Sequence, residues 1–156
     1  MEVILADYLG FCYGVKRAIH LARSSAQSGS ASTLGPIIHN PQMVARLAGE
    51  GIGAVDSLTE VSSGETVIIR SHGVGPAVYE EVKERGLHIV DATCPHVKKA
   101  QMAAHQLSKD GREVVVIGEK QHPEVKSIFE WSGRNAVVVE TVGRSEERRV
   151  GKECRS

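Results

Sequence analysis

Short apolar stretches alternate with helical patterns along most of the chain. Stretches rich in Val, Ile, Leu and Ala predict strands at residues 2–7, 66–70, 87–92, 113–117 and 135–140. A turn and a helical pattern follow each of these stretches except the last. Strand–helix alternation with β-branched residues in the strands is typical of an α/β protein, in which helices cover a parallel sheet.

The predicted helices begin and end at recognisable signals. In the first helix, Val15, Ala18, Ile19 and Ala22 recur at positions i, i+3, i+4 and i+7, which gives one apolar face. Further helices are predicted from Asn40-Pro41 to about Gly49, through Val78 and Val82 to Gly86, from Cys94-Pro95 to Asp110-Gly111, and from Pro123 onward. Asparagine before proline suits a helix start, and glycine suits the position after a helix.

Composition narrows the range of functions. The chain has 156 residues, 41% of them hydrophobic, which fits one α/β domain or part of a larger protein. Lys plus Arg and Asp plus Glu are both 19, so no positive field favours nucleic acid or an anionic membrane. No apolar run approaches the roughly 18 residues of a membrane span, and the start lacks the basic residues of a signal peptide. We expect a cytoplasmic protein.

The last segment, residues 143–156, departs from the pattern. It holds eight charged residues and one aliphatic residue, Val150, so it cannot bury itself. We interpret it as a solvated, non-native tail and set it aside, together with Cys154. Without it the formal charge is 14 minus 16, or −2.

Reactive side chains recur where predicted strands end. Cys12, His39, His72 and Cys94 each follow an apolar stretch, and His122 with Glu124 follows the stretch at 113–117. Ligands of open parallel sheets bind outside the carboxyl ends of the strands, which is where these connections lie. An imidazole and a carboxylate two residues apart at such a position also suit proton transfer. The sequence therefore predicts a functional site at this edge.

Each of these residues also has a structural explanation. Cys12 lies between Gly10 and Gly14 and could fill a tight space, and Cys94 could do the same at its helix start. His39 could belong to a helix cap, and His72 could be a turn residue. No C-x-x-C pair, P-loop or dinucleotide-binding fingerprint is present, so a zinc ribbon, a P-loop NTPase and a dinucleotide-binding enzyme are not supported.

Taken together, the motifs resemble the 4-hydroxy-3-methylbut-2-enyl diphosphate reductase family. The matching stretches are residues 10–15 (GFCYGV), 38–40 (IHN), 71–74 (SHGV), 91–95 (DATCP) and 122–125 (HPEV). They occur in the family's order and at about its spacing. The resemblance covers residues 1–142.

This resemblance implies a trefoil-like fold of three α/β units around a 4Fe–4S cluster. Residues 1–94 would form the first unit, and residues 95–142 an incomplete second unit. The enzymes of this family convert 4-hydroxy-3-methylbut-2-enyl diphosphate to isopentenyl and dimethylallyl diphosphate in isoprenoid biosynthesis. A ferredoxin or flavodoxin-like protein would supply the electrons.

The resemblance also implies roles for individual residues. Cys12 and Cys94 match two of the three cysteines that hold the cluster. His39, His72 and His122 match the histidines that bind the substrate's diphosphate, and Glu124 matches the catalytic proton donor. The third cysteine of the family lies beyond residue 142, so we expect an N-terminal fragment that is inactive by itself. A small zinc-binding module and a cofactor-free α/β binding module are the alternative interpretations.

Overall fold

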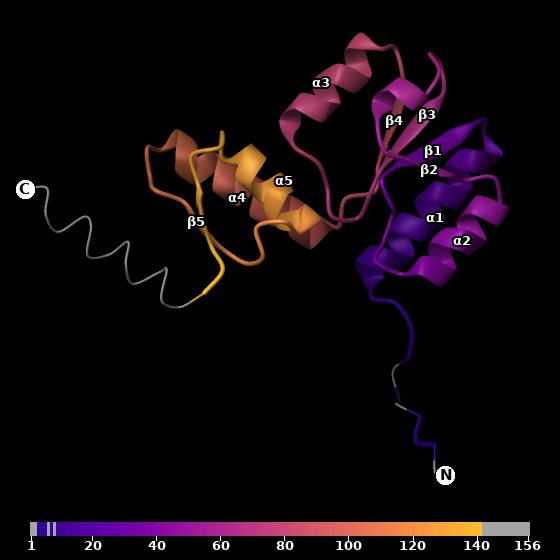
Figure 1. Ribbon diagram of the computed structural model, residues 1–156, viewed down its shortest axis with the longest axis horizontal. Helices are drawn as coiled ribbons and strands as arrows, with labels where there is room; N and C mark the ends of the chain where they lie inside the picture. The colour runs from indigo at the N-terminus through magenta and orange to yellow at the C-terminus, as the bar shows by residue number, and fades with distance from the viewer. Residues whose placement is uncertain (1–2, 6, 8, 142–156) are drawn as a thin grey trace, which may run out of the picture.

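Two parallel sheets and the helices packed on them make up the part of the chain that the computed structural model describes, residues 3–5, 7 and 9–141 (Figure 1). In chain order the elements are α1 (Tyr13–Gln27), β1 (Ala31–Leu34), α2 (Pro41–Gly49), β2 (Ala54–Val55), η1 (Leu58–Glu60), β3 (Thr66–Ile69), α3 (Pro76–Glu84), β4 (His88–Asp91), α4 (Pro95–Lys109), β5 (Val115–Ile117), α5 (Pro123–Trp131) and β6 (Val137–Val139). The α/β fold with parallel sheets is confirmed.

The first sheet has the strand order β2-β1-β3-β4, and all its strands are parallel. Strand β3 lies inside it, and Val67, Ile68 and Ile69 are fully buried. Successive side chains of a strand point to opposite faces. Ile68 accordingly packs in a cluster with residues of α1 and α2, whereas Val67 packs in a cluster with Val82 of α3. Helices therefore cover both faces of this sheet.

The second sheet pairs β5 with β6, and α4 and α5 pack against one of its faces. Val114 and Ala136 are buried in a cluster with Ala104 of α4. Val115 and Ile117 of β5 are 51% and 81% exposed. The prediction that helices cover the sheet is thus correct for both faces of the first sheet, but for only one face of the second sheet.

Most predicted helix signals are confirmed. The side chain of Asn40 accepts a hydrogen bond of 2.8 Å from the backbone N–H of Met43, with Pro41 as the first helical residue. Gly86 follows α3 with φ +66°, in the left-handed region where glycine avoids strain.

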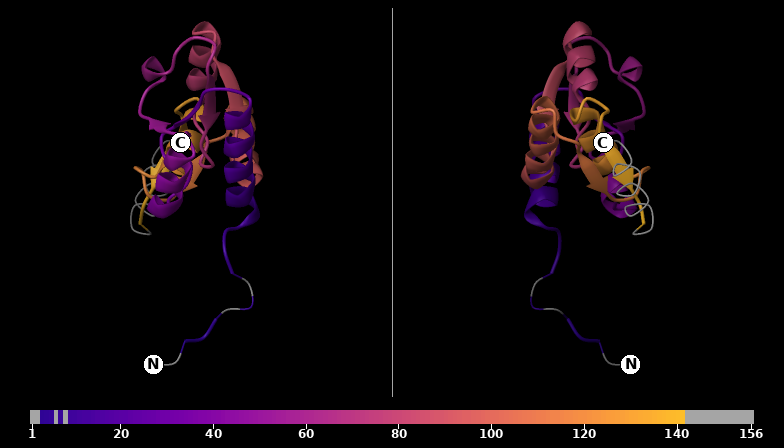
Figure 2. Two further views of the ribbon diagram at one scale, coloured as in Figure 1. Left: turned by 90° about the vertical axis from the view of Figure 1, so that its right-hand side faces the viewer. Right: turned by 90° about the vertical axis from the view of Figure 1, so that its left-hand side faces the viewer.

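One strand prediction was wrong, and the strands β1 and β2 were not predicted. Residues 3–5 form no strand: they lead away from α1 (Figure 1 and Figure 2), and Val3, Ile4 and Leu5 are 70–85% exposed. An apolar run becomes a strand only beside a partner strand, and none pairs with this segment among the described residues. Strand β1 was missed because its sequence, Ala-Ser-Thr-Leu, has no apolar run.

The charged tail that the sequence predicts, residues 143–156 with Cys154, lies outside the described residues. Within the described ranges, no helix combines the length and the apolar character needed to cross a membrane.

Removing a buried side chain from the central strand should be far more damaging than removing an exposed one. We expect Ile68→Ala to lower the free energy of unfolding by about 2–5 kcal/mol, because it leaves a cavity between sheet and helices. Ile117→Ala in β5 is the matched control and should change it by less than about 0.5 kcal/mol. Urea denaturation measures both. Equal losses would contradict the assigned burial.

Candidate functional site

Three histidine rings from three separate connections lie against one another. His39 lies between β1 and α2, His72 lies between β3 and α3, and His122 is the N-cap of α5. The ring centroids are 4.2 Å apart for His39 and His72, 5.3 Å for His39 and His122, and 5.6 Å for His72 and His122. One ring nitrogen of each lies within 4.8 Å of the others. We call these residues the histidine cluster.

The first two connections are joined directly through their backbone. Both the N–H and the hydroxyl of Ser71 donate to the carbonyl oxygen of Ile37, at 3.1 and 2.9 Å. Ser71 and Ile37 are buried, so these hydrogen bonds are sheltered from water. They hold the loop that carries His72 beside the loop that carries His39.

His122 is held by the helix that it begins. Its Nδ1 accepts a hydrogen bond of 3.2 Å from the backbone N–H of Glu124, so it caps α5. Nδ1 can accept only when it carries no proton, and the neutral ring then carries its proton on Nε2. The cap therefore leaves an Nε2–H donor on the histidine cluster. Glu124 lies two residues away in the first turn of the same helix.

Burial keeps His72 neutral. Its pKa falls from 6.5 to about 4, first because the ring is desolvated and then because His39, His122 and Arg70 lie near it. The Nδ1 atom of His72 is buried and has no hydrogen-bond partner among the described residues. His72 thus contributes an uncharged ring with an unused polar atom.

Arg70 brings positive charge to the loop that carries His72. Its side chain is half-buried, and desolvation lowers its pKa. Its Nε is buried and has no hydrogen-bond partner within the described ranges. Arg70 lines a cavity of about 340 Å³ that also touches Gly73 and Val74, which follow His72, and Pro123, which follows His122. The site therefore has a half-buried cation near the imidazole of His72.

The two cysteines lie at the starts of two helices. Cys12 is the N-cap of α1 and is exposed, and Cys94 is the N-cap of α4 and is partly buried. The two helix starts are neighbours, because a Cβ atom on Gly14 of α1 would lie 2.6 Å from the Sγ of Cys94. Neither thiol is part of the histidine cluster.

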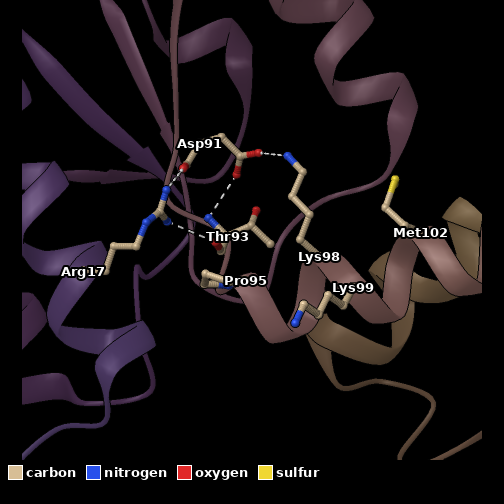
Figure 3. A pocket seen from close by; sticks show the side chains of 7 residues that line it. All are labelled: Arg17, Asp91, Thr93, Pro95, Lys98, Lys99 and Met102. Atoms are coloured by element: carbon tan, nitrogen blue, oxygen red, sulfur yellow. Dashed lines mark hydrogen bonds and ion pairs between the residues drawn. The ribbon is translucent and has the colours of Figure 1, made fainter.

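A second cavity, of about 540 Å³, lies beside the start of α4 (Figure 3). Arg17 of α1 crosses to this segment and donates to the carbonyl oxygens of Thr93 and Asp91, at 3.1 and 3.3 Å. Lys98 pairs with the carboxylate of Asp91, whose pKa is held below its usual value, against the effect of burial, by hydrogen bonds from Lys98 and Thr93. Two of its three cations, Arg17 and Lys98, are already engaged with the protein, and it contains none of the clustered histidines, so this cavity is the weaker candidate for a charged ligand.

The sequence placed the histidines in the right connections. The structure brings His39, His72 and His122 together and puts Cys12 and Cys94 at neighbouring helix starts. Glu124 lies in the first turn of α5, two residues after His122, but its carboxylate is not part of the histidine cluster. Cys12 does not follow a strand, contrary to the prediction. Polar residues that tie the site together were missed: Arg17, Gln101 and Ser127. Nothing in their spacing distinguishes them from solvated positions on amphipathic helices.

Gly14 should not tolerate a side chain, because the added Cβ would overlap Cys94. We expect Gly14→Ala to lower the free energy of unfolding by about 1–3 kcal/mol. Gly49→Ala, at the end of α2, is the control: a Cβ there meets nothing within 4 Å, and the change should stabilise the protein by about 0.5 kcal/mol. Urea denaturation compares the two, and a stabilising Gly14→Ala would refute the close contact.

His72 should resist protonation well below neutral pH. Its folded pKa of about 4 lies below the ordinary 6.5, so its neutral form favours folding fully above pH 6.5. That contribution is lost as the pH falls from 6.5 towards 4. Histidine side-chain NMR over this range, with His72→Asn to assign the signal, measures the pKa. A midpoint near 6.5 would show that the ring is not desolvated.

Comparison with known proteins identifies relatives across most of the chain. The pattern of the LytB protein family matches residues 3–153. The 4-hydroxy-3-methylbut-2-enyl diphosphate reductase of Citrifermentans bemidjiense is 51% identical over 140 residues, which are 89% of this chain and 50% of the relative. The enzyme of the same name from Dehalococcoides mccartyi (strain CBDB1) is 47% identical over 138 residues, 88% of this chain and 48% of the relative. The chain thus spans about half the length of these relatives.

Solved structures agree with this relationship. One solved structure is that of (E)-4-hydroxy-3-methyl-but-2-enyl diphosphate reductase, described as the terminal enzyme of the non-mevalonate pathway. It superposes on this chain with a TM-score of 0.80 at 45% sequence identity, and the match covers 93% of this chain and 53% of the chain in that structure. The structure of the reductase from Plasmodium falciparum has a TM-score of 0.86 at 28% identity, and the match covers 90% of this chain and 45% of the chain in that structure. Since the family pattern extends over nearly the whole sequence and the fold agrees, the chain belongs to the LytB protein family.

Proposed function

We propose that this chain forms part of a reductase of 4-hydroxy-3-methylbut-2-enyl diphosphate, and that the histidine cluster binds the diphosphate of the substrate. The observation that carries the proposal is the convergence of three imidazoles from three connections, with ring nitrogens within 4.8 Å of one another. The names of the relatives support the choice of substrate. The reaction belongs to isoprenoid biosynthesis and would take place in the cytoplasm.

The cluster suits a diphosphate because it offers donors rather than a dense set of cations. The Nε2–H of His122 can donate, and the neutral ring of His72 can donate when its proton is on Nε2, because its Nδ1 is buried. The ligand also meets the N-terminal end of α5, where the helix dipole favours negative charge. Arg70 adds a half-buried positive charge nearby. This combination accounts for anion binding in a chain whose net charge is zero.

Glu124 is proposed as the group that delivers a proton to the reacting end of the substrate. Reduction with two electrons and two protons breaks the allylic C–O bond, releases the hydroxyl as water and leaves isopentenyl or dimethylallyl diphosphate. A carboxyl group beside the diphosphate site is well placed to protonate the departing hydroxyl. Its position next to His122, in the first turn of α5, supports this role.

Cys12 and Cys94 are proposed as two thiolate ligands of a 4Fe–4S cluster. Both begin a helix, neither thiol makes a capping hydrogen bond, and Gly14 gives the Cys94 sulfur room beside α1. The described residues thus fit two of the three cysteine positions that the family resemblance implies. When bound, the cluster supplies electrons taken from a ferredoxin or flavodoxin-like donor.

A zinc site is the second candidate function. Three imidazoles are a common ligand set for Zn²⁺, and one nitrogen of each ring lies within 4.8 Å of the others. In this alternative the histidine cluster would be a metal centre and would not bind diphosphate. The same variants can test both functions.

Binding of inorganic pyrophosphate to the full chain tests the proposal, with isothermal titration calorimetry as the measurement. We expect saturable binding that weakens at least about tenfold in His39→Asn and His72→Asn, since the shorter asparagine side chain cannot place a donor where the ring nitrogen lies. His20→Asn on the exposed face of α1 is the control and should bind as the unchanged chain does.

Two results would contradict the proposal. One is the absence of saturable pyrophosphate binding by the unchanged chain. The other is stoichiometric Zn²⁺ binding, titrated separately without pyrophosphate, that is lost in the same histidine variants and prevents pyrophosphate from binding. The second result would favour the zinc site.

A further inference from the structure

Helix α5 fixes the loop that carries His72 at two points. The hydroxyl of Ser127 lies 3.0 Å from the carbonyl oxygen of His72 and 2.8 Å from that of Glu124, so its one proton is shared between the two carbonyl groups. The indole N–H of Trp131 donates to the carbonyl oxygen of Val74 at 2.9 Å. Ser127 and Trp131 are one helical turn apart, so they lie on the same face of α5. The helix that begins at His122 therefore also grips the backbone around His72.

Gln101 of α4 completes this contact. Its side-chain amide donates to the hydroxyl of Ser127 at 3.1 Å, and the two residues are 0% and 2% exposed. The same amide lies against Gly73, where an added Cβ would be 2.3 Å from Nε2. Gly73 has φ +73°, and its N–H donates to the carbonyl oxygen of Arg70 at 3.0 Å. The peptide that follows His72 is thus enclosed by a tight turn, a hydroxyl and an amide.

Gln101 is a poor choice for stability alone. Its Oε1 is buried and lacks a hydrogen-bond partner among the residues that the structure describes. An unsatisfied buried polar atom costs about 1–3 kcal/mol, which an apolar side chain of similar shape would avoid. Since Gln101 lowers the stability of the interior, its presence there is better explained by the backbone and side chains that its amide contacts.

We propose that Ser127 and Gln101 are positioning residues for the histidine cluster. By holding the carbonyl group of His72, they fix the peptide plane that follows it, and with it the direction in which the His72 side chain leaves the backbone. The ring then stays between His39 and His122, with its nitrogen turned to the same ligand. This inference rests on the proposed function of the cluster.

Paired measurements of affinity and stability separate positioning from simple support of the fold. We expect Ser127→Ala and Gln101→Met in the full chain to weaken pyrophosphate binding about tenfold each, as misplacement of a binding group does. The double variant should lose little more than either single variant, because both residues act on one carbonyl group. Gln101→Met should keep or raise the free energy of unfolding, since it removes the unsatisfied amide oxygen.

Ser132→Ala is the matched control. Ser132 is also a fully buried serine at α5, and its hydroxyl donates to the carbonyl oxygen of Phe129 and accepts from the N–H of Ala136. It should lose about as much stability as Ser127→Ala and leave pyrophosphate binding unchanged. Unchanged affinity in both Ser127→Ala and Gln101→Met would overturn the inference, as would an equal loss of affinity in Ser132→Ala.

A direct view of the rings keeps this test independent of the proposed function. If the unchanged chain does not bind pyrophosphate, the proposed function fails, but positioning can still be followed by NMR. Proton–proton contacts between the His72 and His39 rings, whose centroids are 4.2 Å apart, should weaken in Ser127→Ala and persist in Ser132→Ala. Persistence in both variants would overturn the inference.

Discussion

Parallel pairing on both sides of β3 is the constraint on which the site depends. β1 and β4 pair in register with β3, so that Ile69 lies opposite Leu34 on one side and Asp91 on the other. The three strands therefore end at one edge, and the loops that carry His39, His72 and Cys94 leave from it. The pairing is stabilised in turn by the buried Val67 and Ile68, which pack against helices on the two opposite faces of the sheet. The core thus sets the site's geometry before any functional side chain takes part.

The site combines polar groups with few charges. One imidazole is kept neutral by burial, a second is committed to a helix cap, and the nearby guanidinium of Arg70 makes no ion pair within the described part of the chain. Donors that are already desolvated and oriented lose little when a ligand replaces water. Under the proposed function, the same arrangement would let a chain of zero net charge bind a strongly anionic group.

Local patterns predicted most of this structure, and non-local contacts account for the errors. Asn40-Pro41 and Gly86 mark helix boundaries through their own backbone preferences, so they could be recognised in the sequence. The histidine positions followed from the rule that strand ends share an edge. The strand prediction fails at residues 3–5 because an apolar run needs a partner strand. Strands β1 and β2 were not predicted because they become strands through their pairing with each other and, for β1, with β3.

The same reasoning explains which site residues were missed. Gln101 is a polar residue on a helix, and sequence alone would place it in solvent. It is buried because α4 packs against α5, and it becomes relevant to the site because Ser127 stands between it and His72. Such a role depends on three segments at once, so no spacing within one segment can predict it.

The histidine cluster draws its members from two separately built sheets. His39 and His72 belong to loops of the first sheet, whereas His122 belongs to a helix that packs on the second, and no strand pair connects the sheets in the described residues. A ligand that touches all three rings is therefore also a cross-link between the two units. Its binding energy adds to the free energy that keeps them aligned, so that occupancy and the rigidity of the whole chain rise together.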